Sequence, residues 1–496
     1  MRQEKTPLFE AVKQYVASGT IPFHVPGHKQ GQGLPELRDY VGETVLRMDL
    51  TCLPGLDNIC NPRDVIKEAE ELAAEAFGAD RAFFLVNGTT AGIQAMIMAV
   101  CRPGEKLILP RNAHKSAISG LIISGAQPVY IEPEINQDFG ISMGVTVEKV
   151  EKALQQHPDA KGVFLANPNY YGTASDLKSI VEIAHGYKVP VIVDEAHGAH
   201  LPFGDGLPMP ALAAGADLAA SSTHKMGGSL TQSSMLFLRQ GLVSVERVKA
   251  VLNLAQTTSP SYLLLSSLDL ARKQMALKGR ELVRKSLALA RWIREELKSI
   301  EGIRLFGEGL AGSPGCYAFD PLKVVINVTG LGMSGYEVER LLREKYNLQV
   351  ELSDLYNVMF LISLGDNMDN CRYLVDCLKS IAGTKKLGNI IKYCPPPPEI
   401  PGMAVLPRDA FYSETRIVPL HEAAGEVSAE AIMAYPPGIP LLCPGEMITQ
   451  EIIDYVNILK QENADLQGTE DPEINQIKVL KKVYPVFGSG MMEDVV

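Results

Sequence analysis

The sequence has little positive charge and few aromatic side chains. Its 496 residues carry 47 Lys and Arg against 58 Asp and Glu, a formal net charge of −11, and include one Trp. An acidic chain without basic runs is a poor ligand for nucleic acids or anionic membranes, so we expect neither as a partner. A small cationic substrate is compatible with this charge.

Two further absences concern the compartment. The eight cysteines show no CxxC spacing, so we expect reduced cytoplasmic thiols rather than disulfides or a zinc site. The N-terminus is charged and lacks an apolar h-region, and the longest uncharged stretch, residues 82–101, is interrupted by Asn, Gly and Thr. We therefore expect a cytoplasmic protein with neither a signal peptide nor a membrane span.

The pattern of residues 66–240 alternates short apolar runs with amphipathic helical segments. This alternation is typical of an α/β domain with a mainly parallel sheet. Later segments predict a helical region at residues 263–299, a βαβ-like stretch at 323–381 and a stiff linker in the polyproline run that begins after Cys394. The predicted strands of the first domain are residues 82–86, 106–109, 128–131, 162–166, 189–194 and 218–221.

The run from Ala220 to Ser234 places Lys225 among hydroxyls, a histidine and glycines. Upstream, the predicted strand ends in Asp194, and His197 follows, so a buried strand delivers a carboxylate and an imidazole to its C-terminal end. These residues suit pyridoxal phosphate (PLP). The lysine forms a Schiff base with the aldehyde, the aspartate pairs with the pyridinium nitrogen, and small hydrophilic residues hold the phosphate.

Two other segments fit the same cofactor. Residues 87–92 form a Gly- and Thr-rich turn that opens a predicted helix at 93–100, and a helix N-terminus with two hydroxyls is a natural phosphate seat. Residues 111–116 follow the second strand, where His114 could stack on the pyridine ring. Each segment alone is also an ordinary helix cap.

Simpler interpretations were weighed against the PLP hypothesis. A lone lysine is usually a surface charge. The Asp-Glu-Ala-His sequence at 194–197 imitates a helicase box, but the chain contains no Gly-Lys pair and thus no P-loop. His197 and His200 have the spacing of a metal pair, yet no Cys or third His lies nearby, so we predict no metal site.

Taken together, the motifs resemble those of the Orn/Lys/Arg decarboxylases, which have the aspartate aminotransferase fold. The likeness covers nearly the whole chain and is greatest to the short arginine decarboxylases of Gram-positive bacteria. It rests on residues 24–31, 87–92, 111–116, 193–200, 220–234, 257–262 and 434–446.

The resemblance implies a fold and a division of the chain. The fold is α/β, the PLP-dependent transferase fold type I, with a large mainly parallel-sheet domain and smaller α+β and C-terminal domains. The expected parts are an N-terminal arm (1–60), the PLP-binding large domain (61–275), a small α/β domain (276–392), a Pro-rich linker (393–402) and a C-terminal domain (403–496).

The resemblance also assigns roles to individual residues. The catalytic group would be Lys225 as the aldimine lysine, Asp194 as the pyridinium partner and His114 as the stacking residue. Glu351 would face the distal cation of the substrate, and Asp354 could add a second acid that favours a guanidinium. The remaining cofactor-binding residues would be Gly88, Thr89, Thr90, Ala196 under the ring, His197, Ser222, His224 and, from the partner subunit, Thr258.

The expected function is PLP-dependent decarboxylation of a basic amino acid by a homodimer or an assembly of dimers. L-arginine, giving agmatine for polyamine and spermidine biosynthesis, is the preferred substrate. Lysine and ornithine stay open, as do a PLP aminotransferase, which would return keto acid, and a catalytically silent PLP-binding regulatory protein. The proton donor to Cα could be His114 or Lys225, and the sequence does not choose between them.

Overall fold

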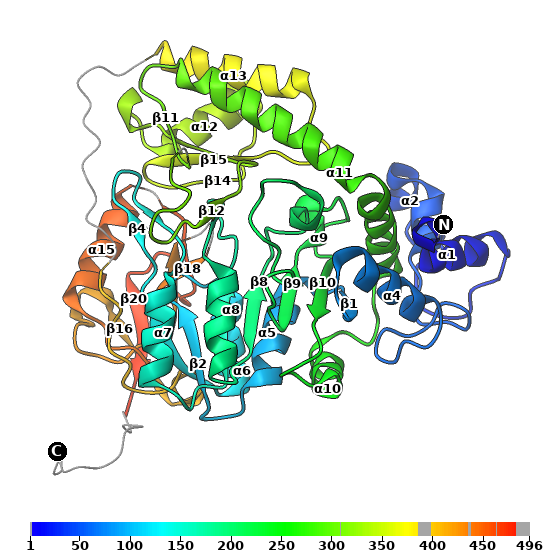
Figure 1. Ribbon diagram of the computed structural model, residues 1–496, viewed down its shortest axis with the longest axis horizontal. Coiled ribbons are helices and arrows are strands. Elements are labelled where there is room, and N and C mark those ends of the chain that lie inside the picture. The colour runs from blue at the N-terminus through cyan, green and yellow to red at the C-terminus, as the bar shows by residue number, and fades with distance from the viewer. Residues whose placement is uncertain (1, 308, 385–397, 435–437, 463, 483–496) are drawn as a thin grey trace.

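A seven-stranded sheet forms the centre of the computed structural model, which describes residues 2–307, 309–384, 398–434, 438–462 and 464–482. The strand order is β1-β10-β9-β8-β6-β2-β3 (Figure 1). The strands are β1 (Arg81–Leu85), β2 (Lys106–Pro110), β3 (Gln127–Ile131), β6 (Gly162–Ala166), β8 (Val191–Asp194), β9 (Leu218–Ser221) and β10 (Ser234–Leu238).

The five strands from β3 to β9 run parallel, whereas β10 is antiparallel to both β9 and β1. All six strands predicted from the sequence are present, and the prediction of a mainly parallel sheet is confirmed. Strand β10 was not predicted. It begins at Ser234, the last residue of the lysine motif, and its five residues are all buried.

Helices cover both faces of this sheet, so its strands are apolar on both sides. In β2, Ile108 packs into one core with α4, α7 and α8, while Leu107 and Leu109 pack into the other with α5 and α6. The helices are α4 (Val65–Phe77), α5 (Gly88–Val100), α6 (Lys115–Ser124), α7 (Val147–Gln156), α8 (Leu177–Gly186), α9 (Thr223–Met226) and α10 (Val245–Ala255).

The start of α5 differs from the prediction. The segment 87–92, expected to be a turn before a helix, is the first turn of α5 itself, because only Gly88 has a positive φ, of 73°. The unpaired N–H groups of the helix therefore belong to the glycine and threonines of the motif.

The small domain follows α11 (Tyr262–Lys298), which runs from the large domain along the second sheet (Figure 1). That sheet has the order β11-β13-β15-β14 and is covered by α12 and α13. Its elements are β11 (Arg304–Leu305), β13 (Lys323–Asn327), α12 (Gly335–Tyr346), β14 (Leu352–Ser353), β15 (Asn357–Leu361) and α13 (Met368–Ala382).

The predicted βαβ-like stretch is a split unit. Strands β13 and β14 flank β15, which is antiparallel to both of them, so the two parallel strands do not pair with each other. A tight turn at residues 354–356 folds β15 back beside β14, which inserts β15 between the strands that the helix connects.

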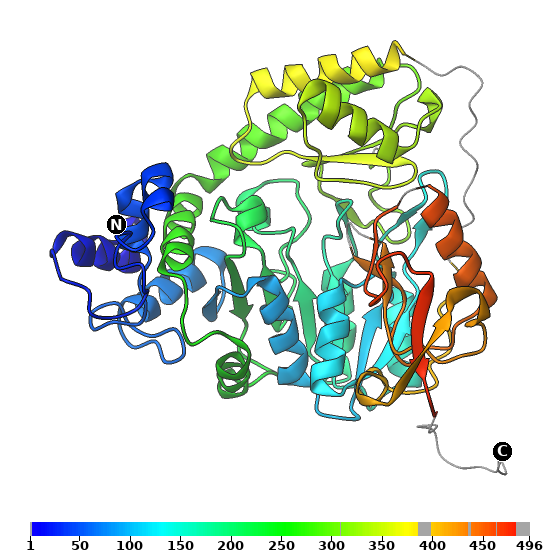
Figure 2. The same ribbon diagram turned by 180° about the vertical axis from the view of Figure 1, so that it is seen from behind.

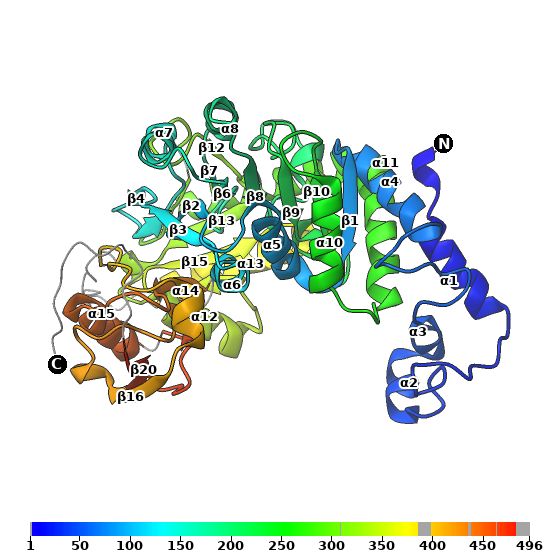
Figure 3. The ribbon, with the colours of Figure 1, turned by 90° about the horizontal axis from the view of Figure 1, so that it is seen from below.

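The N-terminal arm and the C-terminal domain lie at opposite ends of the molecule (Figure 3). The arm packs α1 against α11, where the Asp269 carboxylate accepts from the N–H groups of Leu8 and Phe9. In the C-terminal domain α14 packs against α6, as the view from behind shows (Figure 2). The elements are α1 (Pro7–Ala17), α2 (Pro35–Val41), α3 (Glu43–Met48), α14 (Pro407–Tyr412), β16 (Thr415–Pro419), β17 (Ile432–Ala434), β18 (Ile439–Leu442), α15 (Gln450–Gln461), β19 (Leu466–Gln467) and β20 (Gln476–Leu480).

The first half of the predicted linker, 393–397, lies outside the described residues, and the domain boundaries stay predictions. In the described part of the chain, no helix is both long and apolar enough to cross a membrane. The remaining short elements are η1 (Arg2–Glu4), β4 (Ile135–Asn136), β5 (Ile141–Ser142), β7 (Thr173–Ala174), η2 (Leu201–Phe203), β12 (Ala318–Phe319), η3 (Thr329–Leu331) and η4 (Leu420–Glu422).

Candidate active site

The candidate site lies at the C-terminal ends of β8 and β9, where open α/β sheets bind ligands. Asp194 is the last residue of β8, and its register partner in β9 is Ala220. Lys225 lies four residues after Ser221, the last residue of β9, in the short helix α9. This helix lies between the central sheet and the small domain (Figure 1).

The Lys225 amine is held by aromatic neighbours. Its Nζ lies 2.9 Å from His197 Nε2 and 5.6 Å from the centroid of the Tyr170 ring. Burial, followed by the Lys225 charge, lowers the pKa of His197 well below its ordinary value, so His197 is neutral and accepts from the lysine. Burial also lowers the pKa of Lys225, although the charges of Asp194 and Glu351 oppose this shift.

The Asp194 carboxyl is buried and receives one backbone hydrogen bond, from the Ala196 N–H at 3.0 Å. Burial raises its pKa, while this hydrogen bond and the Lys225 charge act in the opposite direction. A buried carboxylate is stable only with a cationic or strongly donating partner. Asp194 therefore has the property that a pyridinium nitrogen requires.

Three hydroxyl groups gather where α5 begins. Thr89 Oγ1 lies 2.6 Å from Ser222 Oγ and 2.8 Å from Ser234 Oγ. The first N–H groups of a helix have no acceptor within the helix, and the helix dipole favours an anion there. Together with Gly88 and Thr90, these groups can hold a phosphate.

Two histidines border this region. His114 is the N-cap of α6, where its Nδ1 accepts from the Ser116 N–H at 3.2 Å. Burial and the Lys225 charge lower the pKa of His114 to about 4, so it is a neutral ring. His224 Nδ1 lies 2.9 Å from the Ser233 carbonyl oxygen, which fixes the imidazole beside the lysine.

The two acids predicted to bind substrate have different surroundings. Glu351 is exposed on the small domain, and its charge raises the pKa of Lys225. Asp354 is occupied instead. Its oxygens accept from the N–H groups of Tyr356 and Asn357, the Asn357 amide and the Tyr171 hydroxyl. These bonds fill the acceptor sites of one carboxylate, so Asp354 shapes the turn before β15, and its contact with substrate stays a prediction.

Thr258 lies in an exposed segment between α10 and α11. The neighbouring Thr257 N–H bonds to Asn87 Oδ1 of the same chain, at the start of α5. The segment therefore lies beside the start of α5 in its own protomer, where the hydroxyl groups that can hold a phosphate gather. Its contact with the site of a partner subunit stays a prediction.

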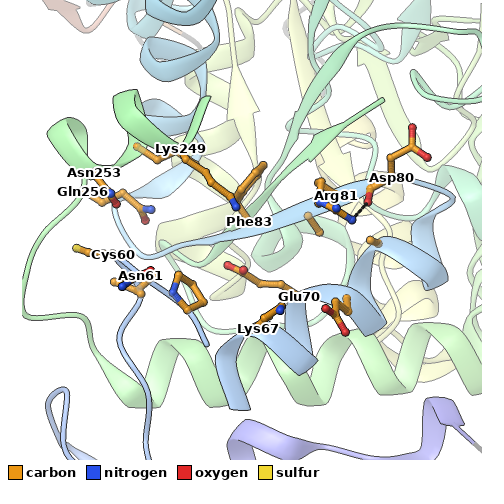
Figure 4. Close-up of a pocket in the computed structure, with 16 residues that line it drawn as sticks. Cys60, Asn61, Lys67, Glu70, Asp80, Arg81, Phe83, Lys249, Asn253 and Gln256 are labelled. Carbon is orange, nitrogen blue, oxygen red and sulfur yellow. Dashed lines mark hydrogen bonds between the residues drawn. The ribbon is translucent and has the colours of Figure 1, made fainter. Parts of the chain in front are cut away.

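Two other features lie outside this site. Among the described residues, no three His, Cys, Asp or Glu side chains are placed to hold a metal ion. A cavity of about 400 Å³ opens at the β1 edge of the sheet, between α4, α10 and residues 59–62 (Figure 4). Glu70 points into this cavity, which does not contain Lys225 or Asp194.

Together, the sheet order, the strand-end aspartate and the lysine beyond the next strand define a PLP-dependent enzyme of fold type I. The chain matches the family models "Orn/Lys/Arg decarboxylase, major domain" over residues 6–370 and "Orn/Lys/Arg decarboxylase, C-terminal domain" over residues 398–479. The chain therefore belongs to the Orn/Lys/Arg decarboxylase family, as the motifs indicated.

Its relatives include several curated proteins. An arginine decarboxylase of Bacillus subtilis (strain 168) is 49% identical over 97% of this chain and 99% of its own length. An arginine decarboxylase of Bacillus anthracis is 45% identical over 98% and 99%. The lysine decarboxylase LdcA of Pseudomonas aeruginosa is more distant, at 26% over 92% and 76%.

Solved structures show the same fold. The E. coli constitutive lysine decarboxylase superposes with a TM-score of 0.83 at 23% identity, covering 96% of this chain and 82% of that one. The ureidoglycine-glyoxylate aminotransferase of Bacillus subtilis superposes with 0.52 at 17% identity, covering 65% and 86%. The predicted fold class is confirmed.

PLP is the cofactor of this family and fold, and the residues present fit it. Lys225 offers the amine for the aldehyde, Asp194 a buried carboxylate for the ring nitrogen, and the α5 N-terminus with its three hydroxyls a phosphate seat. That His114 and Ala196 contact the ring stays a prediction.

The sequence analysis missed Tyr170 and Ser234. Tyr170 contacts both His197, at 4.9 Å between ring centroids, and Lys225. It follows the predicted strand 162–166 in a loop rich in Asn and Tyr. Its place just after the end of a parallel strand could have indicated that it belongs to the site. Ser234 lies within the lysine motif, but spacing alone does not bring it to Thr89.

Proposed function

We propose that the protein decarboxylates L-arginine to agmatine and CO₂. The observation that carries this is the 45–49% identity to arginine decarboxylases of two Bacillus species over nearly the whole chain, joined to a lysine and carboxylate pair arranged for PLP. The relatives with lysine as substrate share far less of the sequence.

In this proposal the chain supplies attachment, charge and exclusion of water. Bound PLP supplies a protonated ring that accepts the electron pair left when CO₂ departs. Asp194 keeps a proton on the ring nitrogen, because its buried carboxylate is stabilised by a cation. Thr89, Ser222 and Ser234 hold the phosphate with the α5 N–H groups.

The pKa shifts favour Lys225 over His114 as the proton donor to Cα. His114, with a pKa of about 4, carries no acidic imidazolium proton at neutral pH. The pKa of Lys225 is lowered toward neutral pH, and a general acid is most effective when its pKa lies near the working pH. His197 Nε2, 2.9 Å away, directs the Lys225 Nζ.

Glu351 is our candidate for recognition of the guanidinium. A carboxylate can take a guanidinium through two parallel hydrogen bonds but an ammonium only as a point charge. Asp354 acts indirectly, by holding the turn that places β14 and Glu351 beside β15. Glu351→Gln should raise KM for arginine and leave the PLP absorbance unchanged.

The deciding assay measures CO₂ release and amine product from arginine, lysine and ornithine. We expect kcat/KM to be greatest for arginine. A preference for lysine would overturn the substrate and keep the decarboxylase. In the same assay Lys225→Ala should lose both the visible band of bound PLP and CO₂ release, and a variant that kept both would remove Lys225 from the mechanism.

We further propose a cytoplasmic homodimer whose agmatine enters polyamine and spermidine biosynthesis. The seven cysteines within the described residues are all free, which suits a reducing compartment. On the N-terminal arm Phe23 is 95% and Tyr40 90% exposed in the single chain, and such apolar side chains suit burial against a second copy.

A further inference from the structure

A second group of buried charges lies beside the candidate site, at the junction of the two larger domains. His200 follows β8 in the large domain, Asp320 lies in the turn before β13, and Lys323 is the first residue of β13 in the small domain. All three side chains are fully buried. His200 Nε2 lies 3.0 Å from Asp320 Oδ2.

The polar atoms of this group are poorly satisfied. Lys323 Nζ, Thr173 Oγ1 and His197 Nδ1 are buried without a hydrogen-bond partner among the described residues, and Asp320 Oδ2 contacts His200 only in poor hydrogen-bond geometry. Buried polar groups are nearly always hydrogen-bonded, so several exceptions in one place indicate that a further polar molecule belongs there.

The backbone connects Lys323 to the Lys225 site. Gly172, with a φ of 91°, packs so closely that a Cβ there would lie 3.0 Å from Lys323 Cγ and 2.8 Å from the Asp320 carbonyl oxygen. Tyr170, two residues earlier in the same loop, is the ring beside the Lys225 amine. The Lys323 stem is thus clamped by the loop that lines the candidate site.

The charges around Lys323 do not fully balance the charge of its ammonium group. Burial lowers the pKa of Lys323 to about 8, whereas the Asp320 charge acts in the opposite direction. Asp320 is shared with His200, and the nearby Lys225 charge repels the Lys323 ammonium. A buried cation with half a counterion is costly unless a ligand completes the pair.

We propose that the Lys323 ammonium binds the α-carboxylate of the substrate amino acid, an inference that rests on the decarboxylase function proposed above. The ion pair aligns the Cα–carboxylate bond with respect to the Lys225 site. When that bond breaks, its electron pair stays on the substrate side and CO₂ leaves uncharged. Lys323 then loses its anionic partner, which weakens retention of the amine product.

The test compares a ligand that has the carboxylate with one that lacks it. In the PLP-loaded enzyme, Lys323→Met should raise KM for L-arginine by about tenfold or more, the cost of losing a charged hydrogen bond. The inhibition constant of agmatine, which has no carboxylate, should stay within about threefold of the wild-type value. Lys323→Arg keeps a cation and should preserve part of the affinity for arginine.

Equal weakening of both ligands would mean that Lys323 has a structural role only, and an unchanged KM for arginine would exclude the contact. If Lys323→Met fails to fold, as judged by thermal melting and PLP content, Asp320→Asn gives the same test with the opposite sign. Removal of the competing carboxylate should lower KM for arginine relative to the agmatine constant, and an unchanged ratio would overturn the proposal.

The assay of the wild-type enzyme with arginine, lysine and ornithine tests the proposed function independently of the Lys323 variants. If the wild-type enzyme decarboxylates lysine rather than arginine, lysine and its amine product replace the pair of ligands, and the inference is tested in the same way.

Discussion

Asp194 shows how one residue can serve chemistry at the expense of local stability. Its carboxyl is buried at the end of β8 with a single backbone donor, and burial raises its pKa. Such a group is poorly solvated when charged and is stabilised by a cation. A charged ring nitrogen would therefore stabilise the Asp194 carboxylate.

We predict that Asp194→Asn retains PLP but lowers kcat by about a hundredfold or more, because the amide cannot compensate a protonated ring nitrogen. Visible absorbance measures cofactor content and single-turnover CO₂ release measures the chemical step. Glu195→Gln is a neighbouring control. The Glu195 carboxylate accepts from the Ala211 N–H. Turnover of Asp194→Asn near the wild-type rate would exclude Asp194 as the electrostatic partner.

Glu70 gives a prediction about pH. Its carboxyl accepts from the Phe84 N–H of the edge strand at 2.9 Å, and burial raises its pKa to about 8 from an ordinary 4.5. The folded state thus keeps a proton that the unfolded state has released. The free energy of unfolding therefore falls as pH rises from about 4.5 to about 8 and then levels off.

Glu70→Gln should remove this decline, because a neutral amide pays no cost of buried charge and its oxygen can still accept from Phe84. Each unit of raised pKa corresponds to about 1.4 kcal/mol, so the variant should gain in melting temperature relative to wild type between pH 5 and pH 9. The exposed neighbour Glu71 provides the control variant, Glu71→Gln. Parallel pH curves for Glu70→Gln and wild type would show that the Glu70 carboxyl is not titrating in this range.

At the scale of elements, a buried ion pair joins two of the motifs noted in the sequence. Arg111, in the loop before α6, donates to both oxygens of Glu446 in the C-terminal domain, at 2.5 and 2.8 Å. It also donates to the Leu441 carbonyl oxygen at 3.0 Å. The Glu446 side chain is completely buried. The C-terminal domain thereby anchors the loop that carries His114.

Glu446→Gln should destabilise the protein by about 3–5 kcal/mol, since it leaves the Arg111 guanidinium buried without a counterion. PLP should also be retained less well, because the His114 loop loses its anchor. Denaturant titration and cofactor content are the measurements. Glu426→Gln, which breaks a half-exposed pair with Arg416, should change stability by less than about 1 kcal/mol. Similar losses for both variants would contradict an anchoring role.

The elements also show what the sequence could predict. Strands of the large domain were predictable because buried parallel strands are continuous apolar runs bounded by turn residues, as in Val191–Asp194. Lys225 and Asp194 stood out because their polar surroundings follow such strands. Lys323 did not, since a lone lysine in an apolar strand gives no sign that its ammonium faces another domain.

The order of strands in the small domain could not be predicted from the sequence either. The short strand β14 is two residues long, and the insertion of β15 beside it depends on the Asp354 turn. Hydrogen bonds between Asp354, Asn357 and Tyr171 fix that turn, and Tyr171 comes from the large domain. Spacing along one segment cannot reveal a contact with a residue about 180 positions away.

At the scale of the whole molecule, the single chain exposes two residues that are predicted to bind substrate or cofactor. Glu351 and Thr258 are both exposed, as are apolar side chains of the arm such as Phe23 and Tyr40. A twofold dimer would bury the same surface on both copies, and each copy could then complete the other's site.

We predict that subunit mixing can detect this arrangement. Lys225→Ala alone and a Thr258→Tyr variant alone should each be inactive, the second because a bulky ring at an exposed position would obstruct the neighbouring site. If Thr258 belongs to the partner's site, a mixed dimer has one site in which both residues are native. Random pairing of equal amounts should then restore about one quarter of wild-type activity. Native mass spectrometry would verify subunit exchange, and exchange without any recovered activity would mean that each site is built from a single chain.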